Sequence, residues 1–311
     1  ALLFPGQGSQ LVGMGLELYN EFEIVKEIFT TADKKLNFSL TNLILKGPEE
    51  KLQLTQNTQP AILTVSYSIF RVLKDEFKFN FDNFKYFAGH SLGEYSALVC
   101  AEALKFEDAL YLLYERGRAM QQAVPVGQGK MLAVLGTKIN EIKSLLNSLD
   151  FKTGICQIAN DNAEGQVIIS GDSKSVEFFQ TNLKEKKIKA IPLKVSAPFH
   201  CSLMKPAAEV MKNKIKDINF SKPNFEIISN VTAQAENNPE NIKKLLIDQI
   251  FSSVKWRESL LKMSNNSVSN FVEIGPGKVL TGMVKRTIKN VNCFSINTIA
   301  DIKDLNDKFK R

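Results

Sequence analysis

The segment Gly89-His90-Ser91-Leu92-Gly93 is the part of the sequence that decides the fold. It lies between a short apolar run, Tyr86–Ala88, and a run of small and apolar residues, Tyr95–Leu104. Glycines two positions before and after a serine let a strand and a helix pass close together, with the serine exposed at the sharp turn. The order predicts a nucleophile elbow, in which the backbone N–H of Leu92 can face an oxyanion. A glycine–serine turn that only caps a helix is the alternative.

A serine nucleophile needs a base, and the chain has two histidines. His90 adjoins Ser91, and neighbouring side chains at such a turn point apart, so we expect His90 to hydrogen-bond beneath the turn. His200 lies in Pro198-Phe199-His200-Cys201 and is by elimination the candidate base. The alternative is a histidine that serves only the surface or the core. We expect Cys201 to pack rather than to react.

Strands alternate with helices on both sides of the elbow. We expect a strand at Ala1–Phe4 and helices at Ala61–Glu76 and Phe106–Gln122. After residue 195 the same rhythm resumes as a strand (Phe225–Asn230), two helices (Pro239–Ile250, Val254–Met263), a strand (Phe271–Ile274), a helix (Gly277–Ile288) and a strand (Val291–Ile296). This alternation predicts an α/β protein with a parallel sheet and helices on both faces.

The intervening segment, which begins at Pro125-Val126-Gly127-Gln128-Gly129, has a different order of expected elements. The expected elements are a strand (Met131–Leu135), a helix (Asn140–Leu149), two strands (Gly154–Ala159, Gln166–Ile169), a helix (Ser173–Lys186) and a strand (Ile188–Leu193). This βαββαβ order is ferredoxin-like. We therefore predict a core formed by residues 1–126 and 196–311, with a small inserted domain at residues 127–195.

Composition and charge exclude several classes of protein. The 311 residues contain no apolar run long enough for a membrane span, and the lysines are too dispersed to indicate nucleic-acid binding. Four cysteines without a CxxC pair indicate neither a zinc site nor a redox motif, and they fit reduced thiols in the cytoplasm. The chain opens on an apolar strand, so we expect no signal peptide.

The net charge of +7 has two possible explanations. Only six of the 40 cationic residues are arginine, which indicates codon bias as the main cause. Steering of an acidic partner is the second effect that such a charge permits.

Five motifs now occur in order along the chain. They are Phe4-Pro5-Gly6-Gln7-Gly8-Ser9-Gln10, Gly89-His90-Ser91-Leu92-Gly93-Glu94-Tyr95, Ile158-Ala159-Asn160-Asp161-Asn162, Pro198-Phe199-His200 and Val272-Glu273-Ile274-Gly275-Pro276-Gly277. Together they resemble the malonyl-CoA:acyl carrier protein transacylases of bacterial type II fatty acid synthesis, an acyltransferase family, from residue 1 to about residue 300. The resemblance implies an α/β-hydrolase-like core with a ferredoxin-like insert, in agreement with the pattern described above.

The resemblance also implies roles for individual residues of the catalytic machinery. Ser91 would carry the acyl group, and His200, 109 residues downstream, would be its base. Gln249 would position His200 through an acceptor oxygen. The backbone N–H groups of Gln7 and Leu92 would form the oxyanion hole.

Three further residues would contact the substrate. Arg116, 25 residues after the serine, would bind the free carboxylate of malonate, for which a planar guanidinium is suited. The sequence by itself leaves Arg116 and Arg118 level, and the alternative is a surface ion pair. Asn160 matches a position that lines the cleft. Phe199 matches a phenylalanine that in related acyltransferases accompanies malonyl rather than methylmalonyl use, with a purely core aromatic as the alternative.

The implied function is transfer of a malonyl group from malonyl-CoA to the phosphopantetheine thiol of acyl carrier protein, by a ping-pong route that feeds fatty acid elongation. No metal or redox cofactor is expected. The expected partners are malonyl-CoA and an acidic, transiently bound acyl carrier protein, and we expect a cytoplasmic monomer. A serine esterase or thioesterase is the second hypothesis. An inactive module that binds carrier proteins is the third, against which the intact Ser91 and His200 weigh.

Overall fold

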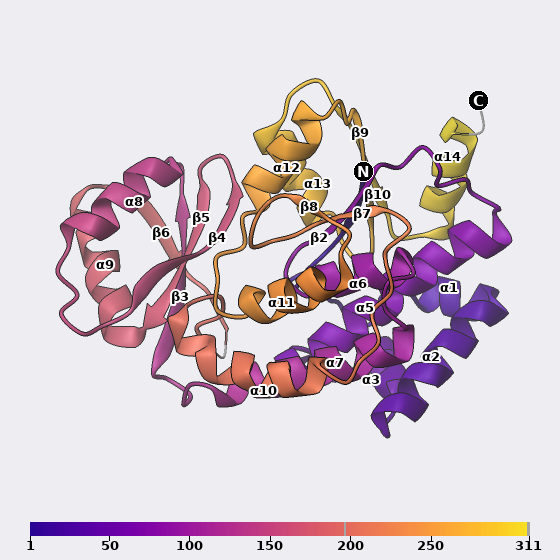
Figure 1. Ribbon diagram of the computed structural model, residues 1–311, viewed down its shortest axis with the longest axis horizontal. Helices are drawn as coiled ribbons and strands as arrows, with labels where there is room; N and C mark the ends of the chain where they lie inside the picture. Colours follow the sequence, from indigo (N-terminus) through magenta and orange to yellow (C-terminus); the bar gives the residue numbers. More distant parts are fainter. Residues whose placement is uncertain (196, 310–311) are drawn as a thin grey trace.

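The computed structural model describes residues 1–195 and 197–309, and it contains two sheets (Figure 1). The larger sheet has the strand order β10-β9-β1-β2-β7-β8. Its strands are β1 (Leu2–Phe4), β2 (Tyr86–Gly89), β7 (Glu226–Ile228), β8 (Ala235–Glu236), β9 (Asn270–Ile274) and β10 (Asn292–Ile296). All neighbours pair in parallel except β7 and β8, which are antiparallel.

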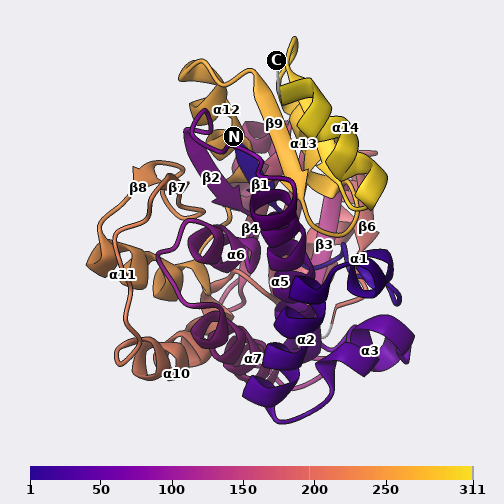
Figure 2. The same cartoon turned by 90° about the vertical axis from the view of Figure 1, so that its right-hand side faces the viewer.

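Helices cover both faces of the larger sheet, as expected for buried parallel strands. Leu2 and Phe4 of β1 face a core shared with α5 (Thr55–Arg71), α6 (Gly93–Cys100) and α7 (Phe106–Gln122). Leu3 faces the opposite core, formed with α12 (Trp256–Asn265) and α13 (Val279–Thr287). Helix α2 (Glu23–Leu36) packs against α5 and α7 (Figure 2). This arrangement confirms the predicted fold class.

The remaining helices lie around this core. They are α1 (Leu16–Glu21), α3 (Leu40–Lys46), α4 (Glu49–Leu52), α10 (Lys205–Ile215), α11 (Pro239–Gln249) and α14 (Ile299–Phe309), with a short 3-10 turn at Ser202–Met204. Within residues 1–195 and 197–309, no helix is both long enough and apolar enough to cross a membrane.

The smaller sheet has the order β4-β5-β3-β6, and all its neighbours are antiparallel. It contains β3 (Gly129–Leu135), β4 (Cys156–Ala163), β5 (Gln166–Asp172) and β6 (Lys189–Pro192), with α8 (Ile139–Ser148) and α9 (Ser173–Glu185) packed on its outer face (Figure 1). Side chains alternate along β3. Leu132 and Val134 join the outer core, whereas Met131 faces the larger domain. The strand and helix order is the one predicted, and the predicted boundary at residue 196 lies outside the described residues.

Several predicted helix limits need correction. The helix expected at Ala61–Glu76 begins at Thr55, because the polar residues 55–59 face other helices and lack the apolar spacing that marks an amphipathic helix. It ends in a π-helical turn, Val72–Glu76. The helix expected at Tyr95–Leu104 ends at Cys100, and Glu102 then adopts a left-handed conformation with φ 61°. Helical segments were expected after residue 15, but the limits of α1–α4 were not predicted individually, and α10 and α14 were not predicted.

Candidate active site

The elbow at residues 89–93 has the geometry that the glycine spacing predicts. Ser91 sits between β2 and α6 with a φ of 53°. A Cβ atom on Gly89 would lie 1.9 Å from the carbonyl carbon of Gly93, and a Cβ on Gly93 would lie 2.2 Å from the backbone oxygen of Phe4. The backbone N–H of Ser91 donates to Oδ1 of Asn230 at 2.7 Å. This bond ties the elbow, which follows β2, to the segment that follows β7.

His200 reaches the serine from the loop after the small domain. Its Nε2 lies 2.8 Å from Oγ of Ser91, and its Nδ1 lies 2.8 Å from the backbone oxygen of Gln249. A carbonyl oxygen only accepts, so Nδ1 carries the proton and Nε2 is free to take the proton of the serine. Burial and the charge of Arg116 lower the pKa of His200 to about 3, which keeps the imidazole neutral.

The oxygen of Gln249 that orients His200 is the main-chain carbonyl. The side chain of Gln249, which is fully buried, makes other contacts. Its Oε1 accepts from Nη2 of Arg116 at 2.9 Å, and its Nε2 donates to the backbone oxygen of Ser91 at 3.0 Å and to Oε2 of Glu94 at 2.8 Å. The residue therefore contacts the base, the nucleophile and the guanidinium at once.

Arg116 lies on α7 with a side chain that is only 1% exposed. Its Nη1 donates to Oε1 of Gln59 at 2.7 Å, and its Nη2 donates to Oγ of Ser91 at 3.1 Å as well as to Gln249. Among the residues that the structure describes, Nε has no hydrogen-bond partner and the guanidinium forms no ion pair. The site thus holds a buried cation whose hydrogen-bond partners are all neutral oxygens.

Arg118 occupies a different environment on the same helix. It is exposed, and its Nη1 pairs with Oε1 of Glu115 at 2.9 Å. The adjoining Gly117 explains how Arg116 comes so close to α5, because a Cβ there would lie 2.4 Å from Cα of Gln56. The structure therefore separates two arginines that the sequence left level.

A cleft of about 190 Å³ contains the remaining predicted residues. Gln7, Leu92, Asn160 and Phe199 line it together with Ser91, Arg116 and His200. Gln7 is exposed, and its Oε1 accepts from Oγ1 of Thr55 at 2.8 Å. Asn160 and Phe199 are buried. Seven of the eight predicted site residues therefore line one cleft, and Gln249 lies directly behind it.

His90 and Cys201, which the sequence analysis also considered, hydrogen-bond to groups other than Ser91 and His200. His90 has its Nε2 2.8 Å from Oδ1 of Asn162 on β4, and its ring meets that of Trp256 edge-on at 5.4 Å. Cys201 is buried, and its thiol donates to the backbone oxygen of Pro198 at 3.1 Å. In the described part of the chain, no group of three or more His, Cys, Asp or Glu residues is placed to hold a metal ion.

The sequence reasoning missed Gln59, Glu94 and Asn230. Gln59 holds Arg116, and Asn230 holds the elbow. Glu94 is 2% exposed, and burial raises its pKa to about 7. Glu94 is part of a quoted motif, and an acidic residue directly after the second elbow glycine was a signal available in the sequence. Gln59 and Asn230 have no local signature.

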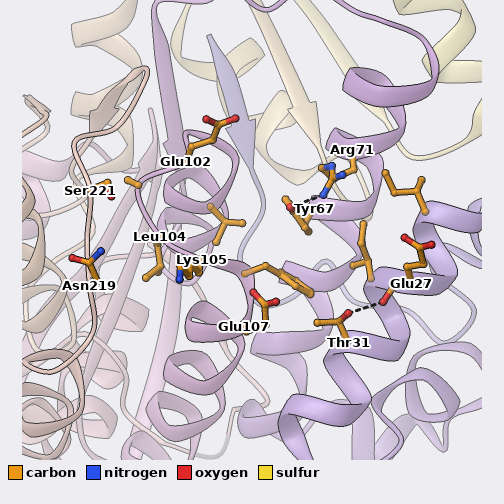
Figure 3. Close-up of a pocket in the computed structure, with 15 residues that line it drawn as sticks. Glu27, Thr31, Tyr67, Arg71, Glu102, Leu104, Lys105, Glu107, Asn219 and Ser221 are labelled. Carbon is orange, nitrogen blue, oxygen red and sulfur yellow. Dashed lines mark hydrogen bonds between the residues drawn. The ribbon is translucent and has the colours of Figure 1, made fainter.

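A second hollow, of about 420 Å³, lies between α2, α5, the start of α7 and residues 219–221 (Figure 3). Two of its charged side chains, those of Arg71 and Glu102, are paired with neighbours. Arg71 bonds Asp75 and Tyr67, and Glu102 pairs with Lys74. None of the predicted site residues lines it, so it contributes nothing to the chemistry of the cleft.

Comparisons with known proteins agree with this geometry. The family model described as "Acyl transferase domain" matches residues 1–311. A malonyl CoA-acyl carrier protein transacylase of Bacillus subtilis (strain 168) is 42% identical over 315 residues, which cover 99% of this chain and 98% of the relative.

Solved structures extend the likeness to the fold. An acyl-carrier-protein-S-malonyltransferase from Bartonella henselae superposes with a TM-score of 0.96 at 40% identity, over 100% of this chain and 99% of that one. A malonyl-transacylase in complex with a type II PKS acyl-carrier protein gives a TM-score of 0.94 at 38% identity, over 99% and 98%. Matched from end to end in sequence and in fold, the chain belongs to the acyl transferase family.

Proposed function

We propose that the protein transfers a malonyl group from malonyl-CoA to the phosphopantetheine thiol of an acyl carrier protein, through a malonyl ester of Ser91. One observation carries the proposal. The guanidinium of Arg116 is buried, its Nη2 lies 3.1 Å from Oγ of Ser91, and no carboxylate of the described residues pairs with it. A buried cation gains most from an anionic ligand, and a planar guanidinium binds a carboxylate through two parallel hydrogen bonds. An acyl group with its own carboxylate supplies that partner.

The chemistry follows from the contacts of Ser91. Nε2 of His200 takes the hydroxyl proton as Oγ attacks the thioester carbon, and the N–H groups of Gln7 and Leu92 stabilise the oxyanion. The carbon–sulfur bond breaks, and the imidazolium returns its proton to the CoA thiolate. The phosphopantetheine thiol then attacks the malonyl ester by the reverse sequence. Every step moves a proton or an acyl group, so the proposal assigns no metal or redox cofactor.

The proposed carrier is an acidic protein that binds transiently, and the net charge of +7 favours its approach. A relative of this chain forms a complex with a type II PKS acyl-carrier protein. We propose that the protein works as a monomer in the cytoplasm, where the product would feed fatty acid elongation.

Intact-mass measurement after incubation with malonyl-CoA tests the proposal. We expect a stable malonyl adduct on Ser91 that disappears when holo acyl carrier protein is added. Rapid release of free malonate without an adduct would indicate a thioesterase instead. No change of mass and no turnover would indicate a module that only binds carrier proteins.

A further inference from the structure

The proposed mechanism gives no role to Glu94, a buried carboxylate that lies beside the site. It lies in the first turn of α6, and its Oε2 accepts from the backbone N–H of Asn230 at 3.1 Å and from Nε2 of Gln249 at 2.8 Å. Within residues 1–195 and 197–309 it forms no ion pair. Burying a carboxylate is costly unless hydrogen bonds compensate. One of its hydrogen bonds connects it through Asn230 to the elbow at Ser91, and the other connects it through Gln249 to the guanidinium of Arg116.

The bond between Glu94 and Gln249 fixes the orientation of the Gln249 side-chain amide. Its Nε2 donates to Glu94 and to the backbone oxygen of Ser91, so the opposite end, Oε1, faces Nη2 of Arg116. A reversed amide would place its NH2 group against the guanidinium and its oxygen against the carboxylate. Donors would then face donors and acceptors would face acceptors.

This orientation matters for the charge at the site. Arg116 is held by two amide oxygens, those of Gln59 and Gln249. Neutral acceptors orient a guanidinium but do not neutralise it, so its charge stays available to a ligand. The carboxylate of Glu94 lies one hydrogen-bonded side chain away, where it can direct Gln249 and does not itself occupy Arg116.

We propose that Glu94 is a positioning residue that acts through the Gln249 amide to hold Arg116 in the orientation that receives the carboxylate of the acyl group. This inference rests on the proposed function, because it concerns the preference for acyl groups that carry a carboxylate. Glu94 also bonds the backbone of Asn230, whose side chain holds Ser91. Damage to the elbow slows every acyl group, whereas displacement of Arg116 slows only carboxylated ones. The ratio of malonyl to acetyl loading on Ser91 therefore isolates the effect on Arg116.

Two conservative substitutions test the length of the Glu94 side chain and its charge separately. Glu94→Gln keeps an oxygen at the same reach, and the two donors that face it favour that oxygen over the NH2 group. We expect its malonyl-to-acetyl ratio to stay at or above the wild-type value. Glu94→Asp keeps the carboxyl group, but its side chain is one methylene shorter and draws back from Gln249. We expect its ratio to fall about tenfold, as for loss of a hydrogen bond to a charged group. The opposite pattern would overturn the proposal.

A double-variant cycle tests the route of the effect. In an Arg116→Ala background, Glu94→Asp should not lower the ratio further, because no guanidinium remains to be positioned. Glu273→Asp is the matched control, since Glu273 is also a buried carboxylate and accepts from the backbone N–H groups of Leu280 at 3.0 Å and Thr281 at 2.8 Å. It should lower the melting temperature and leave the ratio unchanged.

Two results would show the positioning role to be wrong. One is an equal fall of the ratio with and without Arg116, and the other is a fall no larger than that of Glu273→Asp. A wild-type protein that does not load malonyl at all would instead refute the proposed function, so the two failures are distinguishable.

Discussion

The cleft contains a group of hydrogen-bonded polar residues, here called the polar wall, and a group of apolar residues, here called the apolar wall, and its lining is completed by others such as Asn160 on β4 and Met283 on α13. The polar wall consists of Gln59, Ser91, Arg116 and His200. The apolar wall comes from the smaller sheet and the segment after it, and consists of Met131, Ile168, Leu193, Val195 and Phe199. The polar wall is tied together by hydrogen bonds between distant parts of the chain, such as Ser91 with His200 and Arg116 with Gln249.

The chemistry of each wall determines whether a substitution there should have a large or a small effect on activity. Each atom of the polar wall has one geometry that suits proton transfer or charge stabilisation, so its loss removes transition-state binding. The apolar wall acts through shape, and a hydrophobic pocket discriminates weakly between substrates that differ by one methyl group. Substitutions in the polar wall should therefore lower malonyl transfer strongly, whereas substitutions in the apolar wall should cause smaller shifts in selectivity.

Ser91→Ala should have the largest effect. It removes the nucleophilic oxygen and leaves the backbone of the elbow in place, so we expect loss of the acyl adduct and a fall in transfer on the order of 10⁴-fold or more. Intact-mass analysis measures the adduct, and thermal melting verifies the fold. Undiminished transfer by a folded Ser91→Ala variant would mean that the nucleophile lies elsewhere.

His200→Ala should be nearly as damaging, because among the residues that the structure describes Oγ of Ser91 contacts one base, His200, and one permanently protonated cation, Arg116. His90→Ala is the matched control, since the chain contains only these two histidines and both have pKa values lowered by burial. His90 bonds Asn162 rather than the serine, so its loss should reduce the melting temperature more than the loading rate. The reverse outcome would exchange the two assignments.

The elbow and the order of elements could be predicted because their signals are local. Glycine spacing specifies the turn at Ser91, and the limits of α7 in the structure are those that the apolar spacing predicts, Phe106–Gln122. The βαββαβ order of the smaller sheet was likewise evident from alternating strands and helices.

The supporting polar contacts could not be predicted from the sequence. The polar segment that contains Gln59 lacks apolar periodicity and is buried because other helices, among them α4 and α7, pack against it. The bond that orients His200 uses a main-chain carbonyl, which any residue at position 249 would supply. Such contacts depend on tertiary packing.

Arg116→Ala tests whether the polar wall selects a carboxylate. We expect it to remove about 2–5 kcal/mol of transition-state binding for malonyl, by analogy with breaking other buried charge pairs. Acetyl loading should hold or rise, because an unpaired buried charge is lost. Arg116→Lys should restore activity only in part, since an ammonium cannot make the forked contact.

Arg118→Ala is the control on the same helix and should change neither loading rate. Both acyl groups would be measured side by side on all the variants. A malonyl-specific loss in Arg118→Ala would transfer the role to that residue. An equal fall for both acyl groups in Arg116→Ala would make Arg116 structural.

The pH dependence of loading gives a smaller effect within the polar wall. The pKa of His200 lies at about 3 rather than 6.5, so its neutral, basic form persists at low pH. Loading should therefore show no loss from His200 protonation as the pH falls through 6.5. The charge of Arg116 is one cause of the lowered pKa, so Arg116→Ala should raise it and move the acid limb of acetyl loading upward. Burial raises the pKa of Glu94 to about 7, so the contradicting result is an acid limb near 6.5 that persists in Glu94→Gln.

Phe199→Ser should give the smallest effect and defines what the apolar wall does. Phe199 is buried, lines the cleft and directly precedes His200 in the sequence, so we expect it to fill space beside the acyl group. A smaller residue would make room for a branched α-carbon. We expect methylmalonyl loading to rise relative to malonyl loading by at most about 1–3 kcal/mol, the range for one methyl group in a hydrophobic pocket. Competition between the two CoA esters measures the ratio directly. An unchanged ratio in a folded variant would assign Phe199 to packing alone, and selectivity would then rest on the polar wall.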